Sequence, residues 1–209
     1  MAPLPMFPLG SVLLPSQVMP LHVFEPRYRA LVHDVLAADG EFGVCLIERG
    51  SEVGGGDQRL GVGVVAQVAE SAELPDGRWA VVAVGTRRIR VDDWLPDDPY
   101  PRAEVTDLPD PPPTEAELSL RETVTASLRS ALEKLAELGG PASAATTEFS
   151  ADPVLASYQL CALAPISTID TYRLLCASTV GVRLAALHEL LPDVHELLDA
   201  RLGGYDQDG

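Results

Sequence analysis

Two hydrophobic periods divide the chain into an N-terminal part of short strands and a C-terminal part of helices. Before Pro109, short runs rich in Val, Ile and Ala alternate with Gly, Pro and Asp, which is typical of strands and turns. Some runs, such as Val81–Val84, are apolar on both faces, which favours a closed or covered sheet. The predicted strands are Phe42–Glu48, Gly61–Glu70, Arg78–Gly85, Arg87–Trp94 and Arg102–Leu108.

One helix and one tight turn are predicted within this β-rich part. Pro26 suits the first position of a helix, apolar residues recur with helical spacing from Tyr28 to Leu36, and Gly40 can provide a left-handed stop. Asp76-Gly77 lies between two predicted strands and tolerates positive φ, so it predicts a type I′ hairpin turn.

The segment Pro109–Pro113 can form neither a helix nor a central strand, because proline fixes φ and lacks an amide donor. We therefore predict a β-rich lobe over residues 1–108, a linker over 109–113 and a helical lobe over 114–205. Thr114 and Glu117 form a capping box, and an apolar stripe then runs with a 3.6-residue period until Gly139. Later helices are expected to begin at Asp152-Pro153, at Ser167 and near Thr179, the last continuing across Pro192 to Gly203.

The charge balance excludes some classes of partner. The 209 residues include 31 acidic and 15 basic side chains, for a formal charge of −16, while 46% of the residues are hydrophobic. Residues before Pro109 carry 9 basic and 16 acidic side chains, so neither lobe is basic. Because nucleic acids and anionic membranes are bound chiefly through Lys and Arg, we expect neither as a partner. The chain shows no secretory signal, no apolar run of membrane-spanning length and three widely spaced cysteines, which indicates a cytoplasmic protein without a disulfide framework.

Catalytic and cofactor motifs are missing from the sequence. Lys134 is the only lysine and lies mid-helix, so neither a phosphate-binding P-loop nor a Ser-Lys dyad can be assembled. Gly61–Ala66 matches G-x-G-x-x-A by letter, but it begins a predicted strand instead of opening a helix. The four histidines lack metal-ligand spacing, and Cys161 and Cys176 are expected to pack in the helical core. We therefore expect no enzyme activity, no cofactor and no metal.

Several ordered segments resemble a known family. Met6–Pro15, followed by Met19–Arg29, closely resembles the opening of the Lon N-terminal, or substrate-binding, domain. The segments Gly43–Ile47, Gly61–Gly63, Asp76–Trp79 and Gly85–Val91 then follow in the order of that family. The resemblance implies an α+β fold: an N-terminal PUA-like β pseudo-barrel with one inserted helix, followed by a C-terminal α-helical bundle.

The same resemblance implies a binding role. In bacterial Lon proteases, of peptidase family S16, this domain precedes an ATPase module and a Ser-Lys protease module and helps to capture unfolded or damaged polypeptides. The present chain ends where those modules would begin. We therefore expect a stand-alone, non-catalytic polypeptide-binding module of protein quality control, with an adaptor for unfolded or damaged proteins as one form of that role.

Two groups of residues are candidates for polypeptide binding. The resemblance implies recognition by the segment that enters the first helix: Phe24, Glu25, Arg27, Tyr28 and Arg29. The structural alternative is a helix start in which Phe24 and Tyr28 form a hydrophobic staple, Glu25 caps the helix and an arginine pairs with Glu25. The second group consists of apolar residues expected to be exposed in proline-rich loops: Leu14, Pro15, Met19, Val53, Trp94 and Tyr100.

Other functions stay open at this point. PUA-like barrels in other families bind small molecules or nucleic acids, although the acidic balance disfavours RNA. A hydrolase would have to use His22, Glu25 or the acidic residues from Asp92 to Asp98. The glycine-rich loop Gly50–Gly56 is either a clamp or a flexible hairpin connection.

Overall fold

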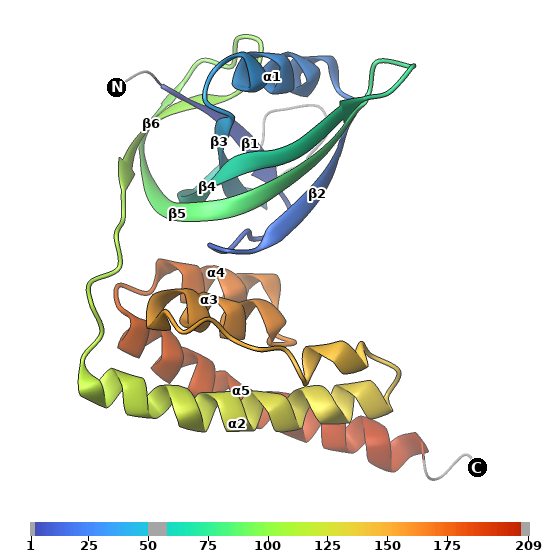
Figure 1. The fold of residues 1–209 in the computed structure, drawn as a ribbon, viewed down its shortest axis with the longest axis vertical. Helices are drawn as coiled ribbons and strands as arrows, with labels where there is room; N and C mark the ends of the chain where they lie inside the picture. The colour runs from blue at the N-terminus through green and yellow to red at the C-terminus, as the bar shows by residue number, and fades with distance from the viewer. Residues whose placement is uncertain (1–2, 50–57, 206–209) are drawn as a thin grey trace. The chain divides into compact units, whose positions relative to one another are not determined.

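The computed structural model describes residues 3–49 and 58–205. It divides into a β unit, Met1–Pro109, and a helical unit, Asp110–Gly209 (Figure 1). The boundary falls within the proline-rich segment that the sequence predicts as a linker. Asp110 belongs to the helical unit, in which its carboxylate contacts Arg183 and Tyr158.

The β unit is a six-stranded sheet with the order β2-β5-β4-β3-β1-β6, and β6 also pairs with β5. This additional pairing closes β5, β4, β3, β1 and β6 into a ring, as the predicted pseudo-barrel requires, and leaves β2 outside the ring, paired with β5. β1 and β3 are parallel, and the other pairs are antiparallel. The strands are β1 (Leu4–Leu9), β2 (Val18–Val23), β3 (Glu41–Arg49), β4 (Gln58–Glu73), β5 (Trp79–Leu95) and β6 (Arg102–Asp107), with α1 (Pro26–Ala37) between β2 and β3.

β5 corrects one prediction, because the two strands expected at Arg78–Gly85 and Arg87–Trp94 form one continuous strand. The register against β4 shifts between Val65 and Ala66, and the Thr86 hydroxyl donates to the Val65 carbonyl at 2.9 Å. An irregularity of this kind bends a strand without ending it. The first part of β5 can therefore pair with β2 and the second part with β6, which closes the sheet.

The predicted type I′ turn between β4 and β5 is also wrong. Type I′ requires positive φ at both central residues, whereas Gly77 has φ of 77° and Asp76 is not among the residues with positive φ. The Gly77 amide donates to the Leu74 carbonyl at 2.8 Å, and the Leu74 amide donates to the Arg78 carbonyl at 2.7 Å. Pro75 presets the first central position, so a longer loop with a left-handed glycine forms instead.

The pattern of hydrophobic residues does not predict β1 and β2, since both contain proline. Pro5 and Pro8 lie in β1, and Pro20 lies in β2 opposite Val82. Met6 of β1 is fully buried and packs with Cys45, Val65 and Ile89 in one cluster of the core. A Cβ at Gly43 would lie too close to the Met6 sulfur, so any side chain there would require the buried Met6 side chain to move.

The helical unit begins each long helix where local signals predict it. The Thr114–Glu117 capping box is formed, and the side chains of Asp152 and Ser167 accept amide hydrogen bonds at the starts of their helices. Cys161 is buried as expected, but Cys176, the last residue of α4, is exposed, so its predicted place in the core is wrong. The helices are α2 (Glu115–Glu137), the short 3-10 turn η1 (Ala142–Ala144), α3 (Pro153–Leu163), α4 (Thr168–Cys176) and α5 (Val180–Tyr205). Among the described helices, none has the length and apolar character needed to cross a lipid bilayer.

Candidate functional site

An open groove of about 170 Å³ lies in the β unit where β1, β2 and the start of α1 meet. Its lining is mainly apolar, with a single carboxylate. The lining residues are Phe7 and Leu9 from β1, Pro20 to Val23 from β2, and Phe24, Glu25 and Tyr28 at the start of α1. The groove therefore gathers residues from the segment that the family resemblance implicates.

Stacked aromatic rings line one side of the groove. The rings of Phe7 and Tyr28 lie 4.2 Å apart between centroids and within 15° of parallel. The Arg27 guanidinium lies over the Tyr28 ring at 4.4 Å, and its Nε is 3.1 Å from the Glu25 carboxylate. Tyr28 is thus held between an aromatic ring and a cation, which makes this wall rigid.

Phe24 projects at the rim of the groove, with 55% of its surface exposed. Pro26 sets the first turn of α1, and Glu25 is the N-cap residue but makes no capping hydrogen bond with its side chain. The expected cap by Glu25 is therefore wrong, while the expected ion pair with Arg27 is present. The backbone turns into α1 here and leaves an aromatic side chain facing solvent.

The structure separates the predicted recognition segment into parts. Phe24, Glu25 and Tyr28 line the groove, and Arg27 supports it from beside the Tyr28 ring. Arg29 lines a different, shallower hollow of about 430 Å³ together with His33, Glu73 and Trp79. It is therefore not brought together with the other members of the segment.

The second predicted group is not a single exposed surface. Leu14, Pro15 and Tyr100 are buried, so their expected exposure is wrong. Met19 in β2 and Trp94 in β5 are half-buried, and Val53 lies outside the described residues.

Leu14 and Tyr100 have specific partners that explain their burial. The Leu14 amide donates to the Gln17 side chain at 3.0 Å within the turn between β1 and β2. The Tyr100 hydroxyl donates to the Asp34 carboxylate at 2.8 Å, which ties the segment before β6 to α1. Burial and this bond to Asp34 raise the pKa of Tyr100 to about 12.

Sequence reasoning missed the part of the groove that comes from β1 and β2. Phe7, Leu9 and Leu21 are brought beside Tyr28 by the pairing of β1 with β3 and of β2 with β5. Half-buried Met19 and Leu21 alternate with exposed Val18 and Pro20 in the structure, but the sequence of β2, with adjacent apolar Val18 and Met19 and with Pro20, does not show this alternation.

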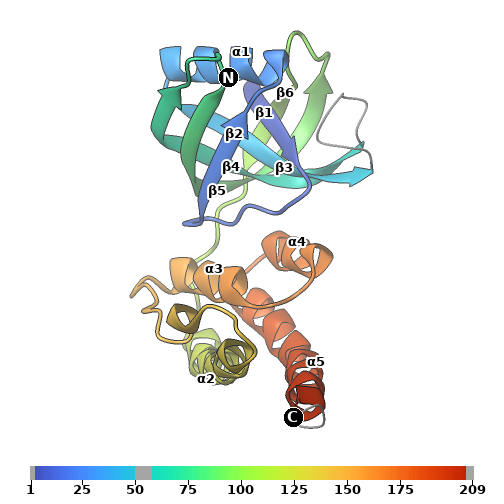
Figure 2. The same ribbon diagram turned by 90° about the vertical axis from the view of Figure 1, so that its right-hand side faces the viewer.

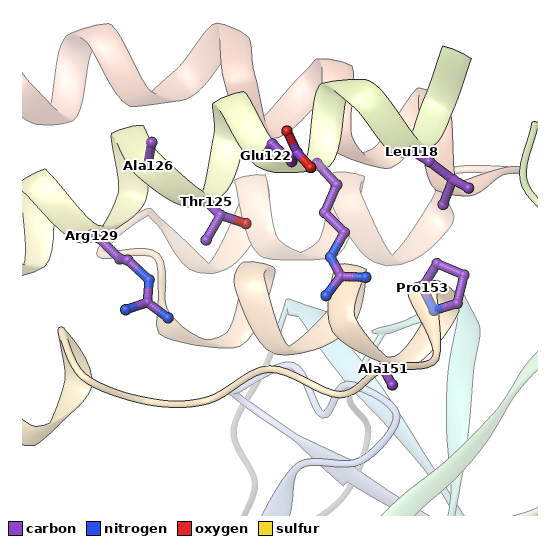
Figure 3. A pocket seen from close by; sticks show the side chains of 8 residues that line it. Leu118, Glu122, Thr125, Ala126, Arg129, Ala151 and Pro153 are labelled. Atoms are coloured by element: carbon purple, nitrogen blue, oxygen red, sulfur yellow. The ribbon is translucent and has the colours of Figure 1, made fainter. Parts of the chain in front are cut away.

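A second cavity, of about 680 Å³, lies along α2 in the helical unit. Figure 3 shows the side chains of Thr125 and Arg129 projecting from α2 into the cavity, with Ala151 and Pro153, at the start of α3, on its other side. Arg121 donates to the Ser150 carbonyl at 3.1 Å, and Arg129 donates to the Thr147 carbonyl at 3.1 Å and lies 5.7 Å from the Phe149 ring. These contacts hold the segment before α3 against α2, which accounts for the two arginines structurally.

The groove is mainly apolar, and its one carboxylate is paired with an arginine. The Glu25 carboxylate pairs with Arg27, and among the described residues no hydrogen bond or ion pair joins Glu25 to His22. Across residues 3–49 and 58–205, no cluster of three or more His, Cys, Asp or Glu side chains could hold a metal ion. The Lys134 ammonium pairs with the Asp199 carboxylate at 2.5 Å.

Comparisons with known proteins agree on one family. The family model of the ATP-dependent protease La (LON) substrate-binding domain matches residues 3–193. A crystal structure of a Lon N-terminal domain protein from Xanthomonas campestris superposes with a TM-score of 0.66 at 27% identity, covering 90% of this chain and 98% of that one. The N-terminal domain of Mycobacterium avium complex Lon protease has the same fold, with a TM-score of 0.67 at 19% identity and coverage of 91% of this chain and 98% of that one.

Curated relatives are much longer than this chain. Lon protease 2 of Herpetosiphon aurantiacus is 35% identical over 105 residues, which cover 49% of this chain and 13% of that protein. Lon protease 2 of Desulfotalea psychrophila is 27% identical over 192 residues, covering 90% of this chain and 24% of that protein. The chain thus spans about a quarter or less of the length of these relatives.

Proposed function

The chain belongs to the family of Lon protease substrate-binding domains, and from this premise we propose that it is a non-catalytic module that binds unfolded or damaged polypeptides in the groove between β1, β2 and α1. An adaptor that presents such polypeptides to a partner is the form of this role that we favour. The observation that carries the proposal is the exposed Phe24 at the rim of an apolar groove with a stacked aromatic wall.

The chemistry of the groove supports a polypeptide ligand. Unfolded chains expose apolar side chains together with unpaired backbone groups, whereas folded proteins bury both. A shallow groove lined by Leu21, Phe24 and Tyr28 can cover an apolar side chain without requiring a particular sequence around it. The binding of many different unfolded segments requires this tolerance.

A nucleic-acid ligand finds little support in the same groove. Its lining includes the Glu25 carboxylate and no Lys or Arg side chain. The β unit is itself acidic, so a phosphate backbone would meet like charge. The PUA-like nucleic-acid alternative therefore has no observation in its favour.

Titration with matched unfolded and folded ligands tests this proposal. The ligand is a small disulfide-bonded protein in its reduced, carboxymethylated form, and the native form of the same protein serves as the folded control. We expect binding to the unfolded form alone. Negligible binding to both forms would contradict the proposed function.

The site is tested by Phe24→Ser, with Ile169→Ser as a matched control. Ile169 in α4 is 57% exposed, which is close to the exposure of Phe24, and lies in the helical unit. Burial of an aromatic side chain against the ligand contributes about 1.5–3 kcal/mol to the free energy of binding. Phe24→Ser should therefore weaken binding of the unfolded protein roughly 10- to 100-fold. Equal losses for both variants would place the binding outside the groove.

A further inference from the structure

β2 is the free edge of the sheet. It pairs with β5 on one side, and no other described strand pairs with it. Figure 1 shows β2 along one side of the sheet, and Figure 2 shows it beside β5, leading toward the start of α1. An unpaired strand edge presents a row of backbone donors and acceptors on which another extended chain can pair.

The hydrogen bonds around β5 identify which residues of β2 face this edge. The Gly85 amide donates to the Gln17 carbonyl at 3.0 Å, and the Ser16 amide donates to the Gly85 carbonyl at 2.8 Å, so Gly85 directs its groups toward the β2 side. On the other side, the Leu74 amide bonds to the Arg78 carbonyl, so Arg78 faces β4. Because the direction alternates along a strand, residues 79, 81 and 83 of β5 bond to β2.

The register transfers this alternation to β2. Met19, Leu21 and Val23 lie opposite residues 83, 81 and 79, so they form the ladder with β5. Val18, Pro20 and His22 therefore direct their backbone groups to the free edge. The presence of Pro20 supports this assignment independently, because proline is tolerated in an edge strand at a position whose missing amide donor would face away from the neighbouring strand, here β5.

These edge groups are open to a ligand. The side chains of Val18, Pro20 and His22 are exposed, and Val18 is 60% exposed. Beyond the ladder with β5, their backbone groups make no hydrogen bond with the described residues. The N–H and C=O groups of Val18 and His22, and the C=O of Pro20, are thus available along one line.

We infer that a bound polypeptide adds to this edge as an extended strand and places one large apolar side chain in the groove beside it. This inference rests on the proposed function and specifies how the ligand binds. The groove of about 170 Å³ is lined by Pro20 and His22 of this edge, and a cavity of about 150 Å³ is large enough for a benzene ring. Backbone pairing supplies affinity independent of sequence, and the groove selects an aromatic or large aliphatic side chain.

Selective N-methylation of a short peptide tests strand addition. The probe is the fluorescently labelled peptide Ser-Val-Thr-Phe-Thr-Val-Ser, whose Thr and Val residues direct their amides to opposite edges when the peptide is extended. One analogue is N-methylated at both Thr residues and the other at both Val residues. We expect one analogue to bind about tenfold more weakly or worse and the other to match the parent, because one set alone bonds to β2.

The analogue that loses affinity also reports the strand direction, because parallel and antiparallel docking place opposite sets against β2. Equal binding by both analogues, or equal loss in both, would overturn strand addition. If the parent peptide and the unfolded protein both fail to bind, the proposed function fails. If they bind and the two analogues do not differ, strand addition alone fails.

A protein variant locates the edge. Val18→Pro removes an edge-facing amide and spares the ladder with β5, as Pro20 already does. We expect it to weaken binding of the parent peptide severalfold, with unchanged thermal unfolding as the check on folding and Ile169→Ser as the control. Full affinity in a folded Val18→Pro variant would overturn the assignment. Sedimentation of the free protein adds a further test, since a dimer that Val18→Pro dissociates would mean that a second copy occupies the edge.

Discussion

At the scale of single residues, Arg183 in α5 is the most constrained charge in the helical unit. Its side chain is fully buried, and its guanidinium donates to Asp110 at 2.6 Å, to the Ser157 hydroxyl at 2.7 Å and to the Tyr158 hydroxyl at 2.8 Å. Tyr158 in turn donates to the other Asp110 oxygen at 2.6 Å. Such a buried network stabilises the helical unit only when all of its members are present. If one member is removed, the groups that it paired with stay buried without a partner, which destabilises the folded state.

Arg183→Ala should lower the free energy of unfolding of the helical unit by about 3–5 kcal/mol, since it leaves Asp110 without its cation and opens a cavity. Arg173→Ala is the matched control, because that arginine is exposed and forms an i,i+3 pair with Asp170. The control should cost about 0.5 kcal/mol or less. Urea unfolding followed by circular dichroism measures both, and equal costs would contradict a special role for the buried network.

The three thiols give a second prediction at this scale. Cys45 and Cys161 are buried and Cys176 is exposed, and burial raises the pKa of Cys161 to about 12. Because the thiolate is the reactive form, one thiol per chain should react rapidly with a thiol reagent at neutral pH, and unfolding should release the other two. Cys176→Ser should remove the fast phase. Rapid modification of Cys161 in the folded protein would contradict the burial.

At the scale of elements, Glu117 connects the starts of α2 and α5. Its carboxylate accepts from the Thr114 amide at 2.6 Å in the capping box, and it also accepts from the Thr179 hydroxyl and the Gly181 amide at 2.9 Å each. These bonds, led by the one from the Thr114 backbone, lower the pKa of Glu117 from 4.5 to about 2. One side chain thus satisfies the first turns of two helices.

The depressed pKa of Glu117 predicts a pH window. The pKa of Glu117 is lower in the folded protein than in the unfolded chain, so the unfolded chain binds the proton more readily. The contribution of Glu117 to the free energy of unfolding is therefore present above about pH 4.5 and is lost as the pH falls toward 2. Glu117→Gln should therefore show a smaller loss of thermal stability than the unmodified protein between pH 5 and about 2. Glu115→Gln, at the same helix start, is the control, and its thermal stability should depend on pH as that of the unmodified protein does. Identical profiles for Glu117→Gln and the unmodified protein would refute the assignment.

At the scale of the whole molecule, the chain passes from the β unit to the helical unit between Pro109 and Asp110. The sequence predicts residues 109–113 as one linker, whereas contacts assign Asp110 to the helical unit through Arg183 and Tyr158. A residue within a proline-rich segment is thus a structural part of the helical unit.

This assignment predicts how the chain can be divided. A fragment of residues 110–209 should unfold cooperatively, because it keeps the complete Arg183 network. A fragment of residues 114–209 should be less stable by about 3–5 kcal/mol, since Arg183 then keeps a buried charge without a carboxylate. Urea unfolding of the two fragments measures the difference, with Asp110→Asn in the longer fragment as the control for charge alone. Equal stability of the two fragments would show that Asp110 is dispensable.

The sequence by itself determined the features that depend on near neighbours. The helix starts at Thr114, Asp152 and Ser167 are correct because a capping side chain bonds to amides two or three residues away. The left-handed glycines at residues 40 and 139 are likewise local. The ordered motifs from Met6 to Val91 were sufficient to indicate the family that the comparisons then established.

Only the tertiary structure decided which distant residues share an environment. Phe7 stacks on Tyr28, Tyr100 bonds to Asp34, and Arg183 reaches Asp110 across 73 positions of the chain. The groove and the free edge of β2 arise because β5 bends and pairs with three strands, which no local pattern specifies. Burial of this kind follows from non-local strand pairing, and for that reason the sequence indicated Phe24, Glu25 and Tyr28 as candidates but not the groove that they line.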